Sequence, residues 1–388
     1  MKKTIALLLC LLFLASVLAG CGETEAGVAG NEPQNTEPQS TETPAETGGI
    51  SAASPDAYDA DLVVLQLDGE DVTWGELYPW VRYAVTAFEE SYGEVEDMSA
   101  PISEEYDVTY SEYILGRAAA MMRYYKSIEV NAAAKGIKLS TEDADYVEST
   151  MTEYKKTFDG DEEYEADIET RFGNEELYRY MMEMSQLYSN MFESVYGENG
   201  EKLPDDELQA AIEEKDYMMA KHILIKTTDE DGNPLSDEEK AEKYAQMEKI
   251  LAALDELDTQ EEKIKKFNAL MGEYSEDTGM LSFPKGYLFT TGQPVPEFEE
   301  AVRGLEEYEY SGIVESAFGY HIIMRMPVDP DATPMEYSQY AAYGIAYPLR
   351  ALVAEEKFSD AVTEMALELP LETTDNYDTI DLAEVFPK

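Results

Sequence analysis

The sequence predicts an α+β protein in which a compact unit with strands is inserted into a mainly helical unit. Apolar residues with helical spacing run from about residue 113, and helical segments continue to residue 214. Residues 217–326 then follow the order β-α-α-β-α-β-β, which describes a compact α+β unit. Residues 334–368 are helical again, and such an isolated amphipathic segment needs other helices to pack against.

We therefore place the helical unit at residues 59–215, the inserted unit at residues 216–328, and a C-terminal helical segment that packs back on the first unit at residues 329–388. The β-containing unit is then either an insertion within the helical unit or a passenger beside it.

The helical unit is expected to open with a strand at residues 62–67, a turn, and a helix with Thr73 as its N-cap. The helix that starts near residue 113 has five residues on one face at helical spacing, namely Ile114, Ala118, Met121, Tyr125 and Ile128. A basic last turn followed by Gly136 predicts its end, and Ser140 begins the next helix.

In the inserted unit, Ser236 and Glu239 form a capping box that predicts the start of the first helix. The elements expected in this unit are strands at 218–226 and 287–289, helices at 236–254, 262–274 and 297–305, and two closing strands between 311 and 326.

The N-terminal residues have the pattern of an export signal. Lys2 and Lys3 precede an apolar run at residues 5–18, and the segment closes with Leu-Ala-Gly-Cys at Cys21. That ending resembles the bacterial lipobox, whose cysteine is acylated and becomes the new N-terminus. We expect residues 1–20 to be the signal peptide and Cys21 to hold the protein on the extracytoplasmic face of the cell membrane through its acyl chains. The alternatives are an uncleaved anchor or a secretory peptide with an incidental cysteine.

Residues 21–58 are expected to form a disordered acidic tether. They are rich in Glu, Thr, Pro, Gly, Ser and Ala, and such a segment buries too little apolar surface to offset its ordering entropy.

Composition excludes several kinds of chemistry. The chain has two cysteines, Cys10 in the removed segment and Cys21, so the mature protein has no cysteine nucleophile, thiolate metal site or disulfide. With two histidines, a zinc site would have to recruit carboxylates, and we expect no metal and no cofactor.

The net charge of −55 repels nucleic acid phosphates and bare anionic membrane. It would attract cationic segments of other proteins, or it reflects the habitat of the host.

The two histidines, His222 and His321, each open an apolar, β-branched run in the inserted unit. An imidazole titrates near neutrality and combines donor and acceptor atoms. The spacing alone leaves two readings open, a shared site or two unrelated strand residues.

The motifs around these histidines resemble the parvulin-type peptidyl-prolyl isomerases. The resemblance lies in five segments that occur in the family order, namely 220–225, 267–277, 292–301, 311–314 and 318–323. Together with the lipobox, the tether and the flanking helices, they resemble the PrsA-type extracytoplasmic foldases, in which N- and C-terminal helices form a chaperone-like domain around the isomerase.

The resemblance implies a site. His222 and His321 would lie on neighbouring strands and form a hydrogen-bonded network with Asp277 beneath the susceptible peptide bond. The residues implied to bind the substrate are Leu288, Phe289, Gln293, Pro294 and Phe298. Isomerisation of an X-Pro bond breaks no covalent bond, so the site needs an apolar slot for the proline ring and a preference for the twisted amide, and no nucleophile.

One segment and one single residue depart from the family pattern. Residues 283–289 replace the Gly-Gly-Asp-Leu-Gly segment, and Pro294 stands where a methionine is usual, which narrows the apolar slot. The loop at 227–239 is acidic, so a phosphoserine-proline preference, which needs a cationic cluster, is not expected.

These features predict a membrane-anchored foldase that isomerises X-Pro bonds in unfolded or partly folded exported proteins. The alternative is a holdase chaperone whose parvulin-like unit is weak or inactive, which Pro294 and the altered segment favour. A solute-binding lipoprotein would require two similar α/β lobes and a hinge, and the sequence pattern has neither.

Overall fold

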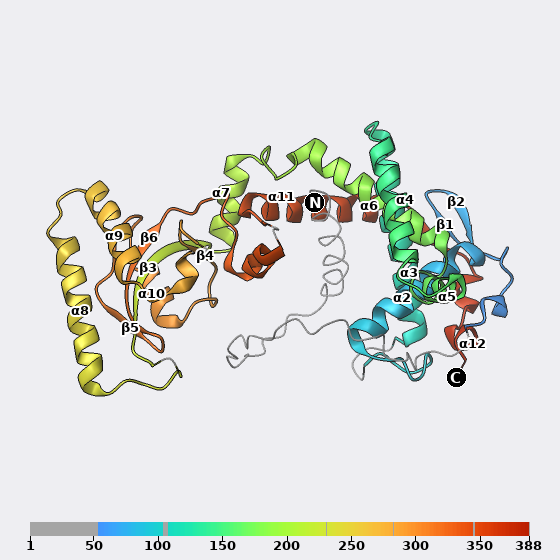
Figure 1. Ribbon diagram of the computed structural model, residues 1–388. Coiled ribbons are helices and arrows are strands. Elements are labelled where there is room, and N and C mark those ends of the chain that lie inside the picture. Colours follow the sequence, from blue (N-terminus) through green and yellow to red (C-terminus); the bar gives the residue numbers. More distant parts are fainter. Residues whose placement is uncertain (1–52, 104–107, 230, 282, 344–345, 388) are drawn as a thin grey trace. The chain divides into compact units, whose positions relative to one another are not determined.

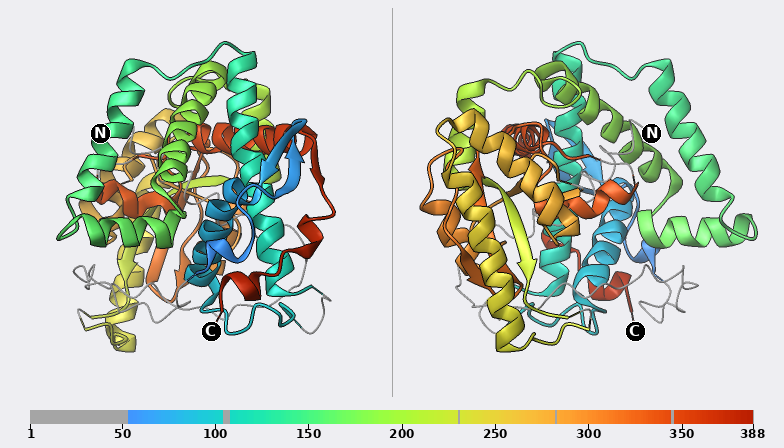
Figure 2. Two further views of the ribbon diagram at one scale, coloured as in Figure 1. Left: turned by 90° about the vertical axis from the view of Figure 1, so that its right-hand side faces the viewer. Right: turned by 60° about the vertical axis from the view of Figure 1, so that its left-hand side comes forward.

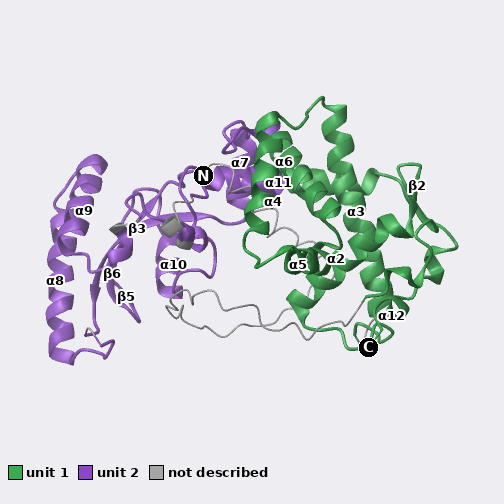
Figure 3. Ribbon diagram, turned by 45° about the vertical axis from the view of Figure 1, so that its right-hand side comes forward, with its two compact units in different colours: residues 1–194, 358–388 green, residues 195–357 purple. Residues whose placement is uncertain are grey.

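The computed structural model describes residues 53–103, 108–229, 231–281, 283–343 and 346–387. The predicted signal peptide, Cys21 and most of the predicted tether lie outside the described residues. The chain forms two compact units (Figures 1 and 3). Unit 1 contains the chain up to Ser194 and from Phe358 onward, and unit 2 is Val195–Lys357. The predicted α+β class, with one unit inserted between two segments of the other, is confirmed.

Unit 1 contains a three-stranded antiparallel sheet in the order β2-β1-β7, formed by β1 (Val63–Leu67), β2 (Glu70–Thr73) and β7 (Leu371–Thr373). Asp68 and Gly69 have φ values of 53° and 79°, as a two-residue hairpin turn requires. The sequence predicted β1 and the turn. It did not predict β7, because three residues at the end of a helical segment have no periodicity to detect.

Helices make up most of unit 1. They are α2 (Trp74–Tyr92), α3 (Tyr110–Ala134), α4 (Thr141–Lys155), α5 (Asp161–Phe172), nearly all of α6 (Glu175–Tyr196), the part of α11 (Leu349–Glu368) from Phe358 onward, and α12 (Leu382–Val385), with short 3-10 turns η1 (Pro55–Ala57) and η4 (Tyr377–Thr379). Thr73 caps α2 and α4 begins after Ser140, as predicted, and each of the two residues forms a complete capping box. Gly136, with φ 70°, follows the end of α3, also as predicted.

Residues 53–58, which the tether prediction placed in a disordered segment, have defined contacts in the structure. The indole N–H of Trp74 donates to the carbonyl of Pro55 at 2.9 Å, and the ring of Tyr58 packs edge-on against Trp74 at 5.4 Å. Ser54 N–H also donates to the carbonyl of Val385. Contacts with Trp74 and with Val385 therefore hold residues 54–58 in place. The sequence of the segment itself does not indicate these partners.

The predicted helix at 334–368 is divided. Residues Met335–Tyr343 form a 3-10 segment, η3, and the α-helix α11 begins only at Leu349. Pro348 immediately precedes α11, and a proline disfavours the α conformation at the residue before it. The helix therefore starts after the proline.

Unit 2 contains the predicted order β-α-α-β-α-β-β. Its elements are β3 (Met218–Lys226), α8 (Asp237–Asp255), α9 (Gln260–Tyr274), β4 (Tyr287–Phe289), α10 (Pro296–Arg303), β5 (Val314–Ser316) and β6 (Gly319–Met326), with α7 (Asp205–Glu214) before them and the 3-10 turn η2 (Thr278–Leu281) before β4. The strands form one antiparallel sheet in the order β4-β3-β6-β5.

Two cores cover the two faces of this sheet. Ile223 and Ile322 face α8 and α9, which lie beside the sheet (Figure 2). Ala220 and Ile323 face α10. Side chains alternate along a strand, so His222 on β3 and His321 on β6 belong to the face that α10 covers.

Unit 2 is wider than the predicted range 216–328. The Arg350 guanidinium donates to the carbonyl of Leu203 at 3.1 Å, and Lys357 pairs with Glu207 at 3.1 Å. The segments on both sides of the β-containing part therefore pack on each other. The boundaries predicted at 215 and 328 stay predictions.

Gly319 allows the tight connection between β5 and β6. Its φ is 144°, and a Cβ there would lie 2.3 Å from the carbonyl oxygen of Ile225. We expect Gly319→Ala to lower the free energy of unfolding by about 2–4 kcal/mol, from backbone strain plus the clash. Urea unfolding followed by circular dichroism measures the change.

Gly312→Ala is the matched control, because a Cβ there meets nothing within 4 Å. Equal unfolding midpoints for the two variants would contradict the structural role of Gly319.

Candidate functional site

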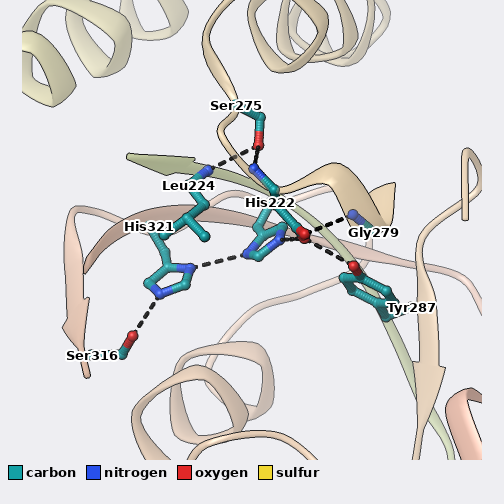
Figure 4. A network of polar contacts seen from close by, with 8 residues as sticks. His222, Leu224, Ser275, Gly279, Tyr287, Ser316 and His321 are labelled. Carbon is teal, nitrogen blue, oxygen red and sulfur yellow. Dashed lines mark hydrogen bonds and ion pairs between the residues drawn. The ribbon is translucent and has the colours of Figure 1, made fainter. Parts of the chain in front are cut away.

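Two buried histidines meet at the centre of the unit 2 sheet. In the β3–β6 pairing, His222 stands opposite Ile323 and His321 opposite Leu224, so the histidines are diagonal neighbours. Their Nδ1 atoms are 3.0 Å apart, and the rings stack at 5.2 Å between centroids (Figure 4). Their exposed fractions are 6% and 2%. The structure therefore brings the two predicted residues into one site.

Asp277 completes the site from the segment that follows α9. Its Oδ2 lies 2.5 Å from His222 Nε2 and accepts a hydrogen bond from the Tyr287 hydroxyl at 2.9 Å. Its Oδ1 accepts from the backbone N–H of Gly279 at 2.9 Å. The Ser275 hydroxyl oxygen accepts from the N–H groups of Leu224 and Asp277, which fastens this segment to β3.

The charges of this network are set by its surroundings. Partial burial opposes ionisation of Asp277, but the hydrogen bonds from His222, Tyr287 and Gly279 and the proximity of His222 lower its pKa to about 2. Burial and the neighbouring His222 lower the pKa of His321 to about 4. Burial and the adjacent Asp277 carboxylate raise the pKa of the Tyr287 phenol. Near neutral pH the site thus holds a carboxylate, a neutral His321 and a neutral phenol.

When both imidazoles are neutral, only one direction is possible for each hydrogen bond of the network. The Asp277 carboxylate only accepts, so His222 Nε2 carries a proton and its Nδ1 has the lone pair. His321 Nδ1 must then donate to His222, and His321 Nε2 accepts from the Ser316 hydroxyl at 2.7 Å. The Ser316 oxygen accepts from the N–H of Phe318 at 3.1 Å. One directed chain therefore runs from β5 to Asp277.

An aromatic wall stands against the histidines. The Phe298 ring, on α10, lies edge-on to His222 and His321 at centroid distances of 5.3 Å and 5.9 Å. Phe289 packs behind it at 6.0 Å. Leu288 and Phe289 have no exposed surface. Phe289 thus supports Phe298, and neither Leu288 nor Phe289 offers surface to a ligand in this conformation.

Gln293 and Pro294 lie in the loop between β4 and α10, outside the polar network of the histidines. The Gln293 side-chain oxygen accepts from Thr290 N–H at 3.0 Å, and its amide donates to Glu336 at 2.9 Å. Gln293 therefore holds the loop with both ends of its amide. Pro294 is half-buried. The substrate-binding roles of both residues stay predictions.

Sequence reasoning missed Tyr287, Gly279, Ser275 and Ser316 as members of the site. Tyr287 had a detectable signal, because strand alternation puts it on the same face as Phe289. The places of the other three residues in the site depend on turns of the chain, which strand alternation does not predict. Ser316, for example, reaches His321 only because the chain turns between β5 and β6.

Two features are absent from the described residues. No group of three or more His, Cys, Asp or Glu side chains arranged to hold a metal ion occurs in this part of the chain. Within the same residues, no helix has both the length and the apolar character needed to cross a membrane.

Comparison with known proteins defines the class of the β-containing part. Residues 222–326 match the PPIC-type PPIase (rotamase) domain family. This range contains the whole histidine–aspartate network and the Phe298 wall. This part of the chain is therefore similar to the peptidyl-prolyl isomerase domains of that family, as the motifs predicted.

The similarity extends to particular foldases. The chain is 32% identical to foldase protein PrsA of Oceanobacillus iheyensis over 180 residues, which are 46% of this chain and 50% of that protein. It is 39% identical to chaperone SurA of Chromohalobacter salexigens over 105 residues, 26% of this chain and 21% of that one. The predicted resemblance to PrsA-type foldases is thus confirmed, although the chain spans only half the length, or less, of these curated relatives.

Among solved structures, the crystal structure of PrsA from Bacillus subtilis is similar with 19% sequence identity and a TM-score of 0.25, covering 80% of this chain and 91% of that one.

The lowered pKa of His321 predicts an unusual titration. We expect its imidazole to take up a proton with a midpoint near pH 4, well below the ordinary 6.5. Because the chain has only two histidines, their NMR signals can be followed separately from pH 8 downward. A His321 midpoint near 6.5 would contradict the buried, neutral state.

The same shift makes stability depend on pH. The unfolded histidine binds a proton at about pH 6.5 and the folded one near pH 4, so the stabilisation is complete above 6.5 and is lost as the pH falls to 4. The loss should be about 3 kcal/mol, and urea unfolding at a series of pH values measures it. A free energy of unfolding that stays constant through this window would contradict the prediction.

Proposed function

We propose that this protein is a membrane-anchored, extracytoplasmic foldase that catalyses cis–trans isomerisation of X-Pro bonds in exported proteins. The observation that supports it most directly is the His222–His321 pair, fixed by Asp277 and walled by Phe298, inside a PPIC-type domain. The substrates would be unfolded or partly folded chains. Relatives with similar sequences are named as a foldase and a chaperone.

The geometry suits a reaction without a covalent intermediate. Rotation about an X-Pro bond faces a barrier of about 20 kcal/mol because amide resonance is lost at the twisted midpoint. A catalyst must therefore bind the twisted amide better than either planar form. The directed chain from Ser316 to Asp277 leaves no free proton for transfer while both imidazoles are neutral. We infer that the histidines shape and orient the site and that Phe298 supplies an apolar contact for the proline ring.

The remaining parts of the chain complete the proposal. The helices of residues 59–215 and 329–388 would hold client proteins near the isomerase, and residues 21–58 would space the folded part from the membrane. The net charge of −55 disfavours nucleic acid as a partner.

The catalytic proposal makes a direct prediction. His222→Ala and Asp277→Ala should each lower kcat/KM in a protease-free prolyl isomerase assay by at least about tenfold, because each leaves a buried polar partner unsatisfied. Asp255→Ala is the matched control. Asp255 also accepts a tyrosine hydroxyl in unit 2, from Tyr310 at 2.8 Å, but lies outside the site.

Unchanged activity in both site variants would exclude a role for the network in catalysis. Circular dichroism of each variant separates loss of activity from loss of folding.

A holdase without isomerase activity is the second candidate. Pro294 and the altered segment 283–289 favour it, and in this conformation Leu288 and Phe289 offer no surface for a proline ring. Wild-type activity no higher than buffer, with intact suppression of client aggregation, would favour the holdase.

The anchor can be tested separately. We expect Cys21→Ser to abolish acylation, because the thiol is the attachment point, and to move the protein out of the membrane fraction of an expressing bacterium. Incorporation of labelled palmitate and fractionation measure both effects. A membrane-bound, unlabelled Cys21→Ser protein would indicate an uncleaved anchor instead.

A further inference from the structure

Tyr287 lies beside His222 and Asp277, two of the proposed catalytic residues. It begins β4 and pairs with Ala220, two residues before His222 on β3. Its ring lies edge-on to that of His222 at 5.8 Å, and its hydroxyl meets the Asp277 carboxylate (Figure 4). It belongs to the segment 283–289, which departs from the family pattern. The segment that differs from the family pattern thus provides an additional contact to the site, from the Tyr287 hydroxyl to Asp277.

The Tyr287 hydroxyl and the His222 ring bind the same oxygen atom. Both reach Asp277 Oδ2, at 2.9 Å and 2.5 Å, while the Gly279 N–H binds Oδ1. Three donors therefore surround one carboxylate, and they come from three different parts of the chain. Without the phenol, Oδ2 would have His222 as its only described donor, and the carboxylate would be freer to rotate about its Cβ–Cγ bond.

The surroundings are shaped to admit this hydroxyl. A Cβ at position 279 would lie 2.1 Å from the Tyr287 hydroxyl oxygen, so only glycine leaves room for it. The Phe283 ring packs against the Tyr287 ring at 5.0 Å and limits its movement. The phenol is half-buried and held on two sides, as a group with a fixed direction requires.

We propose that Tyr287 is a positioning residue of this isomerase site, whose hydroxyl locks the Asp277 carboxylate in the orientation that keeps His222 in its Nε2–H tautomer. The lone pair of His222 Nδ1 then faces His321, and the whole chain of hydrogen bonds keeps one direction. The inference rests on the proposed function for its effect on catalysis, but its effect on the tautomer is independent of any activity.

Tyr287→Phe is the test variant, because it keeps the ring and removes only the hydroxyl. Tyr310→Phe is the matched control, since it removes the same kind of tyrosine–aspartate hydrogen bond, with Asp255, elsewhere in unit 2. The nitrogen NMR signals of the two histidines report the tautomer at pH 8, because protonated and unprotonated ring nitrogens resonate far apart. Kinetics in the protease-free assay report kcat and KM separately.

In Tyr287→Phe we expect the two nitrogen signals of His222 to move toward each other as the tautomers mix. We also expect kcat to fall by about tenfold with little change in KM, since Tyr287 acts through Asp277. Tyr310→Phe should leave both readouts at wild-type values. Wild-type nitrogen signals in Tyr287→Phe would overturn the proposal, whatever the activity.

Gly279→Ala provides a second, independent variant. Its methyl group should displace the hydroxyl and reproduce the tautomer mixing of Tyr287→Phe, whereas the double variant, which has room for the methyl group, should be more stable than Gly279→Ala alone. Equal stability of the two would count against the fitted hydroxyl. An inactive wild type with a single His222 tautomer would refute the proposed function and leave the positioning role of Tyr287 supported.

Discussion

The antiparallel pairing of β3 with β6 is the constraint on which the site depends. It places His222 and His321 on diagonal positions of one sheet face, close enough for their Nδ1 atoms to share a proton at 3.0 Å. A slip of one residue would turn either histidine to the opposite face, toward α8 and α9. The pairing runs from Met219 to Lys226, and the close packing of Gly319 against Ile225 fixes its end. Register, more than any single hydrogen bond, therefore decides whether the site exists.

Burial explains why the polar groups of the site form a closed network. Both histidines are almost fully covered, and an unpaired imidazole there would cost a large part of its hydration free energy. Asp277 at one end and Ser316 at the other give each ring nitrogen a partner. Such a network is rigid, because rotating one member leaves the next unsatisfied. Such rigidity would suit the proposed isomerisation, in which the site has to favour one twisted form of the substrate over two planar ones.

The apolar half of the site is built in layers. Phe298 faces the histidines, and Phe289 fills the space behind it in the core that α10 closes. The loop that leads into α10 is held by Gln293 to Glu336 and by the N–H of Gly292 to Glu299. Glu336 belongs to η3, which follows β6, so a segment outside the matched range 222–326 helps to hold this loop.

By itself, the sequence determined the α+β class and most of the elements, because strand alternation and capping boxes are local signals. The meeting of His222, His321 and Asp277 was implied only by the resemblance of the sequence motifs to the parvulin-type isomerases. The sequence could not determine β7, the ordered residues 53–58 or the late start of α11, which depend on partners far along the chain or on one proline. Only the tertiary structure showed that Phe289 lies behind Phe298 and that the Tyr287 hydroxyl reaches Asp277. The reason is physical: periodicity tells which face a side chain occupies, but its depth and its partner are decided by how distant elements pack.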